Sequence, residues 1–213
     1  REQASAFGIL KVNRQGRIVH FEEKPSPDRC DELESEIPGH GRGLLASMGI
    51  YMFSREALER AIADPALVDF GRHVIPKAIG EMRVQAHFFR GYWEDVGTIR
   101  SYFDASLQLC GPMPPFDFYD AVRPVYTHPR FLPSTKVEGC SLRGALVSEG
   151  CILMGAEIER SVLGIRSRIG QGTRIRNSLV LGADYYEPLV EIDRAGARGL
   201  PPIGIGSDSV VEG

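Results

Sequence analysis

The sequence has little that indicates a metal centre, a membrane segment or a nucleic-acid surface. Its four cysteines and five histidines are scattered, with no C-x-x-C pair and no metal-ligand spacing. The longest apolar run, residues 44–53, is far shorter than a membrane span and is interrupted by Ser47 and Gly49. A net charge of −3 gives no basic footprint for nucleic acid. With no recognisable signal peptide, these absences predict free thiols in a reducing cytoplasm.

Composition divides the chain into three parts. Residues 1–110 mix β-prone runs with helical spacing, and residues 111–136 begin with the linker-like sequence GPMPP. From residue 137 onward, short turn-rich units follow one another regularly. We therefore predict an α/β domain at 1–110, a linker at 111–136 and a β domain at 137–213. Because the chain opens on Arg1 and stops inside its repeating pattern, we also expect a fragment of a longer protein.

The first part opens with a predicted β-hairpin. Two β-prone runs, residues 6–12 and 17–21, flank the turn sequence NRQG. Lys24 lies just beyond the second run, next to a proline that cannot extend a strand ladder, so a stiff backbone would aim its side chain. A solvated surface lysine is the alternative interpretation.

The near-continuously apolar residues 44–53 predict a buried strand. A strand that only fills a core does not require the interruption by Ser47 and Gly49, although the Ser47 hydroxyl could simply bond to the backbone. Ser54 is expected to cap the next helix. Asp69 could cap the helix that follows.

The sequence GYWEDVGT, residues 91–98, is the densest chemical motif. The β-prone residues 84–89 before it and the helical spacing after it predict a strand, a turn and a helix capped by Thr98. That order would place Asp95 at the carboxyl end of a strand, where open α/β sheets bind ligands. Its carboxylate could hold Mg²⁺ against a phosphate, and Trp93 could form an apolar wall. The alternative is a core tryptophan and a turn aspartate.

The last part has aliphatic residues at six-residue intervals. The pairs and triplets are Ile152 and Ile158; Ile169, Ile175 and Leu181; and Ile205 and Val211. This is the hexapeptide pattern of a parallel β-helix, in which each coil buries its aliphatic side chains against the next. Residues 185–202 break the period and should loop out. A β-sandwich is the alternative.

Several motifs, in order, resemble those of the ADP-glucose pyrophosphorylases (glucose-1-phosphate adenylyltransferases). They are FEEKP at 21–25, ASMGIYMF at 46–53, DFGRHVIP at 69–76, GYWEDVGT at 91–98 and SVLGIRS at 161–167. The resemblance implies the C-terminal portion of a Rossmann-like mixed α/β sheet followed by a left-handed parallel β-helix. Arg72 and His73 depart from the family's commonest Lys-Asp pair.

The resemblance also implies roles for single residues. Lys24 would bind the phosphate of glucose 1-phosphate, Glu23 the sugar hydroxyls, and Asp95 the catalytic Mg²⁺; a compact ammonium and a hydrogen-bond-accepting carboxylate suit these tasks. Lys24 and Asp95 would be the catalytic residues. The expected substrate-binding residues are Gly8, Glu23, Lys24, Ser47, Tyr51, Asp69 and Trp93.

The implied reaction converts ATP and glucose 1-phosphate to ADP-glucose and pyrophosphate, in glycogen or starch biosynthesis, by an allosteric homotetramer. The family's glycine-rich nucleotide loop does not occur in these 213 residues, so we expect the chain alone to be inactive. The alternatives are a nucleotidyltransferase for another sugar phosphate, and a non-catalytic regulatory subunit or β-helix assembly module. A hexapeptide acyltransferase is disfavoured, because the repeats contain no histidine.

Overall fold

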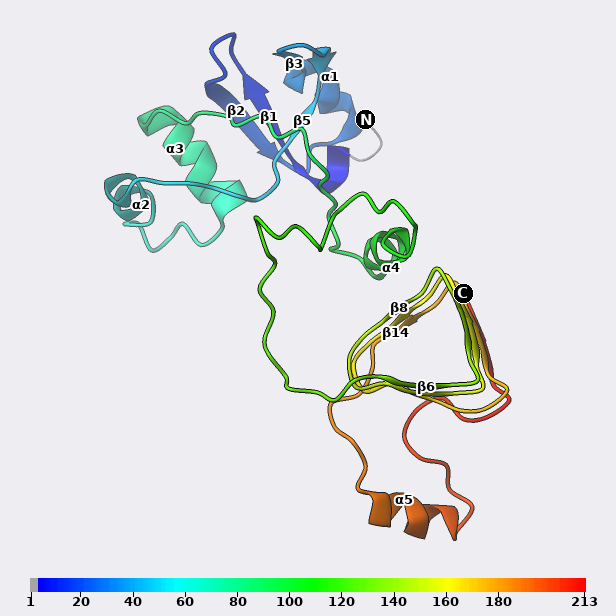
Figure 1. Cartoon of the computed structure of the whole chain (residues 1–213). Coiled ribbons are helices and arrows are strands. Elements are labelled where there is room, and N and C mark those ends of the chain that lie inside the picture. The colour runs from blue at the N-terminus through cyan, green and yellow to red at the C-terminus, as the bar shows by residue number, and fades with distance from the viewer. Residues whose placement is uncertain (1–3) are drawn as a thin grey trace. The chain divides into compact units, whose positions relative to one another are not determined.

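The computed structural model describes residues 4–213 and contains two compact units, one ending at Gly91 and one spanning Tyr92–Gly213 (Figure 1). Each unit has its own sheets and its own core. Among the described residues, no helix combines the length and the apolar character that crossing a membrane requires. All four cysteines are free thiols, as predicted, and burial raises the pKa of the Cys110 and Cys151 thiols.

The first unit is built on the predicted hairpin. Strand β1 (Gly8–Val12) pairs antiparallel with β2 (Ile18–Glu23), and Gly8 lies opposite Glu23 in the register. The turn between them closes through a 2.9 Å hydrogen bond from Gly16 N to Asn13 O. On its other edge β1 pairs with β5 (Leu45–Ala46), which gives the order β2-β1-β5. The end of β2 and the start of β1 therefore lie side by side.

Residues 26–43 form a series of short elements. The 3₁₀ turn η2 (Pro27–Arg29) leads into the short helix α1 (Cys30–Leu33). Strands β3 (Ser35–Ile37) and β4 (Gly41–Gly43) then form a second hairpin. Cys30 and Leu33 pack with Ile9 and Ala4, of the 3₁₀ turn η1 (Ala4–Ala6), in the core of this unit.

The predicted buried strand at residues 44–53 is wrong for most of its length. Only β5 joins the sheet, and Ile50 and Met52 are 76% and 99% exposed. Beyond β5 no strand among the described residues pairs with this segment, so its apolar side chains lack the two-sided cover that a buried strand needs. Ser54, as predicted, caps the next helix, α2 (Arg55–Ala61), by accepting a hydrogen bond from Ala57 N.

The strand predicted at residues 84–89 is also absent. A single bridge joins Gln85 to Arg17, and the rest of the segment is irregular. Before it, the π-helical turn η3 (Phe70–Val74) runs into helix α3 (Ile75–Glu81). The predicted Thr98 cap is confirmed: Thr98 and Ser101 form a reciprocal capping box that starts helix α4 (Ile99–Gln108) in the second unit.

The predicted parallel β-helix is confirmed, and it excludes a β-sandwich because every pairing in it is parallel. Three sheets form the faces of the coils that Figure 1 shows stacked around a triangular core. The first contains β6 (Lys136–Glu138), β9 (Ile152–Met154) and β12 (Arg168–Ile169). The second contains β7 (Ser141–Arg143), β10 (Glu157–Glu159), β13 (Arg174–Arg176) and β15 (Val210–Glu212). The third contains β8 (Leu146–Val147), β11 (Val162–Leu163) and β14 (Leu179–Val180).

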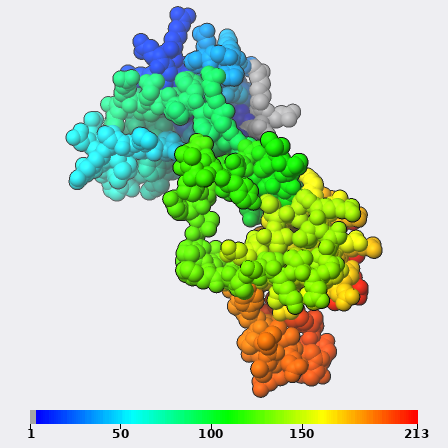
Figure 2. Space-filling model, in the orientation of Figure 1, coloured from blue at the N-terminus to red at the C-terminus, as the bar shows by residue number. Residues whose placement is uncertain are grey.

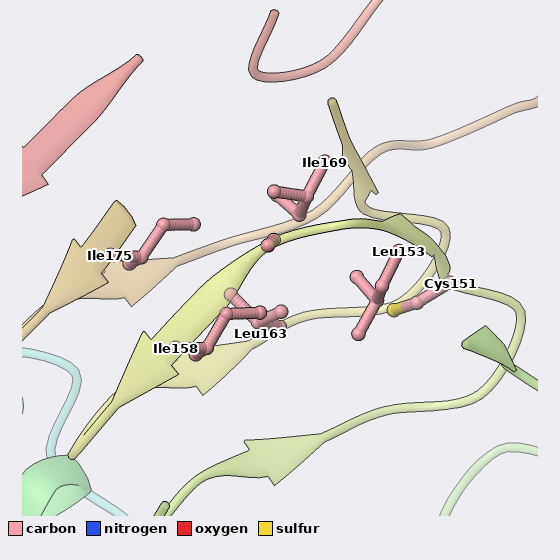
Figure 3. Close-up of a cluster of buried hydrophobic side chains, with 7 residues drawn as sticks. Cys151, Leu153, Ile158, Leu163, Ile169 and Ile175 are labelled. Carbon is pink, nitrogen blue, oxygen red and sulfur yellow. The ribbon is translucent and has the colours of Figure 1, made fainter. Parts of the chain in front are cut away.

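Aliphatic side chains fill the interior of the coils (Figure 3). Ile158, Ile169 and Ile175 of the six-residue pattern are completely buried. The six-residue pattern predicts the wrong inward-facing residue at two places. Leu153 is fully buried instead of its neighbour Ile152, and Leu181 is 75% exposed. In β9 the side chains alternate between the two faces of the strand, so only one of the adjacent residues Ile152 and Leu153 can point inward, and spacing alone does not report which.

The predicted loop-out is confirmed, and it contains helix α5 (Leu189–Gly196), none of whose residues is buried. Figure 2 shows α5 and its flanking segments standing out from the coils. Tyr186 fastens the start of the insert by donating a 2.8 Å hydrogen bond to Gly150 O, and the Arg166 guanidinium lies over its ring.

Candidate functional site

The first unit brings Glu23 together with two glycines from separate segments. Glu23 ends β2 and is half-buried, and Gly8 faces it across the ladder. A Cβ on Gly8 or on Gly71 would lie 2.8 Å from Glu23 Oε2, so both glycines border the carboxylate. Gly8 also makes room for the buried Phe21 ring. Within residues 4–213, no donor forms a hydrogen bond or ion pair with this carboxylate, so its oxygens are available to a ligand.

The backbone of Lys24 is fixed by its neighbours, and its side chain is exposed to solvent. Its φ of 51° lies in the left-handed region that disfavours every residue except glycine and, less strongly, asparagine and aspartate. Lys24 N donates a 3.0 Å hydrogen bond to Phe7 O, and the following Pro25 is buried. No carboxylate in the described part of the chain pairs with its ammonium group. The stiff backbone predicted around this lysine is therefore present, and no described carboxylate neutralises its charge.

Ser47 and Tyr51 form a second pair beside the start of β1. Ser47 N donates a 2.7 Å hydrogen bond to Gly8 O, which ties this segment to the glycine opposite Glu23. The Ser47 hydroxyl accepts from Gly49 N at 3.3 Å, as the alternative interpretation expected, and lies 3.3 Å from the Tyr51 hydroxyl. Its remaining hydrogen-bonding capacity is open to another polar group.

An aromatic stack connects this pair to Asp69. The rings of Tyr51 and Phe70 are stacked with centroids 5.9 Å apart and planes at 17°, and Phe53 meets the Phe70 ring edge-on. Phe70 directly follows Asp69, so the stack joins two segments that are far apart in the sequence. Sequence reasoning missed both Phe70 and Gly71 as individual residues. Their place inside the DFGRHVIP motif was the available signal.

Asp69 caps η3, which was one of its two predicted roles. Its Oδ1 accepts a 2.7 Å hydrogen bond from Arg72 N, and this bond holds the pKa of Asp69 below its usual value. The same Oδ1 would lie 3.5 Å from a Cβ on Gly71. Six of the eight expected site residues therefore belong to one neighbourhood of the first unit or directly border it: Gly8, Glu23, Lys24, Ser47, Tyr51 and Asp69.

Trp93 and Asp95 belong to the second unit. Trp93 is half-buried and Asp95 is exposed, but neither follows a strand, so the predicted placement of Asp95 at the carboxyl end of one is wrong. The Asp95 oxygens would lie 3.2 and 3.3 Å from a Cβ on Gly97, which leaves space beside the carboxylate. Asp95 has no hydrogen-bond or ionic partner among residues 4–213.

Asp95 does not belong to a closed metal site within the described part of the chain. Residues 4–213 contain no group of three His, Cys, Asp or Glu side chains placed to hold a metal. Mg²⁺ keeps several waters and is commonly bound through one or two carboxylates plus substrate phosphates. Asp95, whose carboxylate has no partner within residues 4–213, could supply one such carboxylate ligand.

Two family matches agree with these observations. Residues 1–111 match the family described as nucleotidyl transferase, and residues 130–213 match the GLGC left-handed parallel beta-helix domain. The first match covers more than half of the chain, which therefore belongs to the nucleotidyl transferase family. A nucleotidyl transferase domain followed by this left-handed β-helix is the architecture of the ADP-glucose pyrophosphorylases.

Proposed function

We propose that this chain supplies the sugar-phosphate side of a glucose-1-phosphate adenylyltransferase, which makes ADP-glucose and pyrophosphate from ATP and glucose 1-phosphate. The observation that carries the proposal is a pair of adjacent side chains where β2 ends, Glu23 and Lys24, neither of which has a hydrogen-bond or ionic partner within residues 4–213. An ammonium group and a carboxylate on adjacent residues complement a ligand with a phosphate at one end and hydroxyls at the other.

In this proposal different residues around Glu23 bind different parts of glucose 1-phosphate. Lys24 binds the phosphate, while Glu23 accepts hydrogen bonds from sugar hydroxyls. The Ser47 hydroxyl, Tyr51 and Asp69 border the sugar, and the backbone at Gly8 comes close to it because glycine has no side chain. The expected role of Trp93, which belongs to the second unit, as an apolar wall for the sugar stays a prediction.

The reaction needs no covalent nucleophile from the protein. A phosphate oxygen of glucose 1-phosphate attacks the α-phosphorus of ATP, and pyrophosphate leaves. Asp95 would hold Mg²⁺, which supplies neutralisation of the charge that develops on the phosphates. Lys24 orients the attacking phosphate, so that positioning contributes to the rate as well as to affinity. The proposal includes the expected role in glycogen or starch biosynthesis, the cytoplasmic location and an allosteric homotetramer.

The proposal is tested by titrating glucose 1-phosphate into the 213-residue chain by calorimetry, with glucose and galactose 1-phosphate as comparison ligands. We expect saturable binding that prefers glucose 1-phosphate. Lys24→Ala removes a charge-assisted hydrogen bond of about 1.5–3 kcal/mol, so Kd should rise roughly 10- to 150-fold. Lys77→Ala is the matched control, because Lys77 is an exposed lysine of the same unit that pairs with Asp64.

Two outcomes would contradict the proposal. If the unsubstituted chain does not bind glucose 1-phosphate, the function assigned to this neighbourhood is wrong. If the chain binds it but Lys24→Ala and Lys77→Ala have the same Kd as the parent, the phosphate is bound elsewhere and Lys24 is misassigned.

A further inference from the structure

Gly71 borders the expected sugar-binding carboxylate although it lies outside the motif that contains that carboxylate. A Cβ on Gly71 would lie 2.8 Å from Glu23 Oε2 and 3.3 Å from Glu23 Cδ. Real Cβ atoms essentially never approach another heavy atom to less than 3.0 Å, so any other residue at position 71 would displace the carboxylate. Because the displaced atoms end a flexible side chain, they can move without disturbing the core.

The backbone does not explain why position 71 is glycine. Gly71 is absent from the residues with positive φ, so alanine can adopt its conformation without strain. It lies within the helical turn η3, where glycine is less favourable than alanine by about 1 kcal/mol. What glycine provides at this position is the space that the Glu23 carboxylate occupies.

The two glycines that border Glu23 are not equivalent. A side chain on Gly8 would collide with the Phe21 ring, so a substitution there would disturb the core as well as Glu23. The three atoms nearest to a Cβ on Gly71 belong to the side chains of Glu23 and, at 3.5 Å, Asp69. Gly80, in helix α3, has nothing within 4 Å of the place of its Cβ. Gly71 is therefore the position from which the carboxylate can be moved without a collision with the Phe21 ring.

We propose that Gly71 is a positioning residue that sets where the Glu23 carboxylate lies and so determines how tightly the sugar is bound. The inference rests on the proposed function, in which Glu23 accepts hydrogen bonds from sugar hydroxyls. Such bonds need donor–acceptor distances of about 2.5–3.0 Å and weaken steeply with misalignment. A methyl group at position 71 shifts the acceptor by a distance comparable to that tolerance.

The test compares Gly71→Ala with Gly80→Ala, measuring Kd for glucose 1-phosphate and the unfolding midpoint of each. We expect Gly71→Ala to raise Kd roughly 10- to 100-fold, the size of one charge-assisted hydrogen bond lost, while its unfolding midpoint stays the same or rises. Gly80→Ala should leave Kd unchanged. Titration with inorganic phosphate, which engages Lys24 and not Glu23, should give the same Kd for Gly71→Ala as for the parent.

A double-mutant cycle measures the coupling between position 71 and Glu23 in the Kd for glucose 1-phosphate, which a merely structural role of Gly71 would not produce. Glu23→Asp shortens the side chain that the methyl group displaces. Because both changes act on one carboxylate, the combined loss should be smaller than the sum of the two single losses. Additive losses, or a parental Kd for Gly71→Ala, would overturn the inference while leaving the proposed function standing. A parent chain that fails to bind glucose 1-phosphate would overturn both.

Discussion

The left-handed backbone of Lys24 predicts that this lysine lowers the stability of the unit in which it lies. The left-handed conformation costs a non-glycine residue roughly 1–2 kcal/mol. Glycine removes that cost but loses about 0.5–1 kcal/mol more backbone entropy on folding. Lys24→Gly should therefore stabilise the first unit by about 0.5–1 kcal/mol. Lys24→Ala keeps the strain and should change stability little.

Both substitutions remove the ammonium group, so both should weaken the binding of glucose 1-phosphate to the same extent. Affinity and stability then separate: the two variants lose equal affinity, and only the glycine variant gains stability. Stability is measured from urea-dependent hydrogen exchange of the β1 and β2 amides, which reports the opening of this hairpin alone.

Gly49→Ala is the matched control, because it introduces a side chain at a left-handed position, whereas Lys24→Gly removes one. Gly49 has a φ of 69° and nothing within 4 Å of its Cβ position, so alanine there should cost stability through conformation alone. If Gly49→Ala destabilises the unit but Lys24→Gly does not stabilise it relative to Lys24→Ala, the reasoning about strain at Lys24 is refuted. If both Lys24 variants keep the parental affinity for glucose 1-phosphate, the strained backbone at Lys24 does not contribute to binding this ligand.

Three further predictions follow from the geometry. In an enzyme that carries this chain together with a nucleotide loop, Asp95→Asn should lower kcat and kcat/KM together at unchanged thermal stability, and parental turnover at saturating Mg²⁺ would exclude the metal role. Leu163→Ala should cost the β-helix about 2–5 kcal/mol in chemical denaturation, because Leu163 is completely buried, whereas the exposed Leu181→Ala should cost less than about 0.5 kcal/mol; equal effects would contradict the described interior. The hydrogen bond from Arg72 N lowers the pKa of Asp69, so the ionised carboxylate stabilises the fold above the ordinary aspartate pKa of about 3.9. This contribution is lost as the pH falls through the lowered pKa of Asp69. Urea titrations should therefore show a stability that depends less on acid pH for Asp69→Asn than for the parent.

The sequence was informative wherever local chemistry decides the structure. The β1–β2 hairpin follows from its turn residues, and the caps at Ser54 and Thr98 follow from side chains that reach backbone groups three residues away. The β-helix follows from a repeat that only stacking can bury. In each of these cases the partners lie close in the sequence or are copies of one pattern.

The sequence was uninformative where a partner comes from a distant segment. Residues 44–53 and 84–89 have β propensity, but a strand also needs a neighbour, and a local pattern does not reveal whether one exists. The contact between Gly71 and Glu23 joins two separate motifs, and no spacing predicts it. For the same reason, the individual residues of the candidate site were easier to anticipate than the way they border one another.

The insert that carries α5 shows how the β-helix accommodates added length. Arg174 pairs with Glu157 on one side and with Val210 on the other, and the second connection is about twice as long as the first, yet the register continues unchanged. Closing a flexible loop of twice the length costs only about 0.6 kcal/mol more. The corner after β14 is therefore a position at which this scaffold can gain or exchange sequence, by evolution or by engineering, while the stacked coils keep their register.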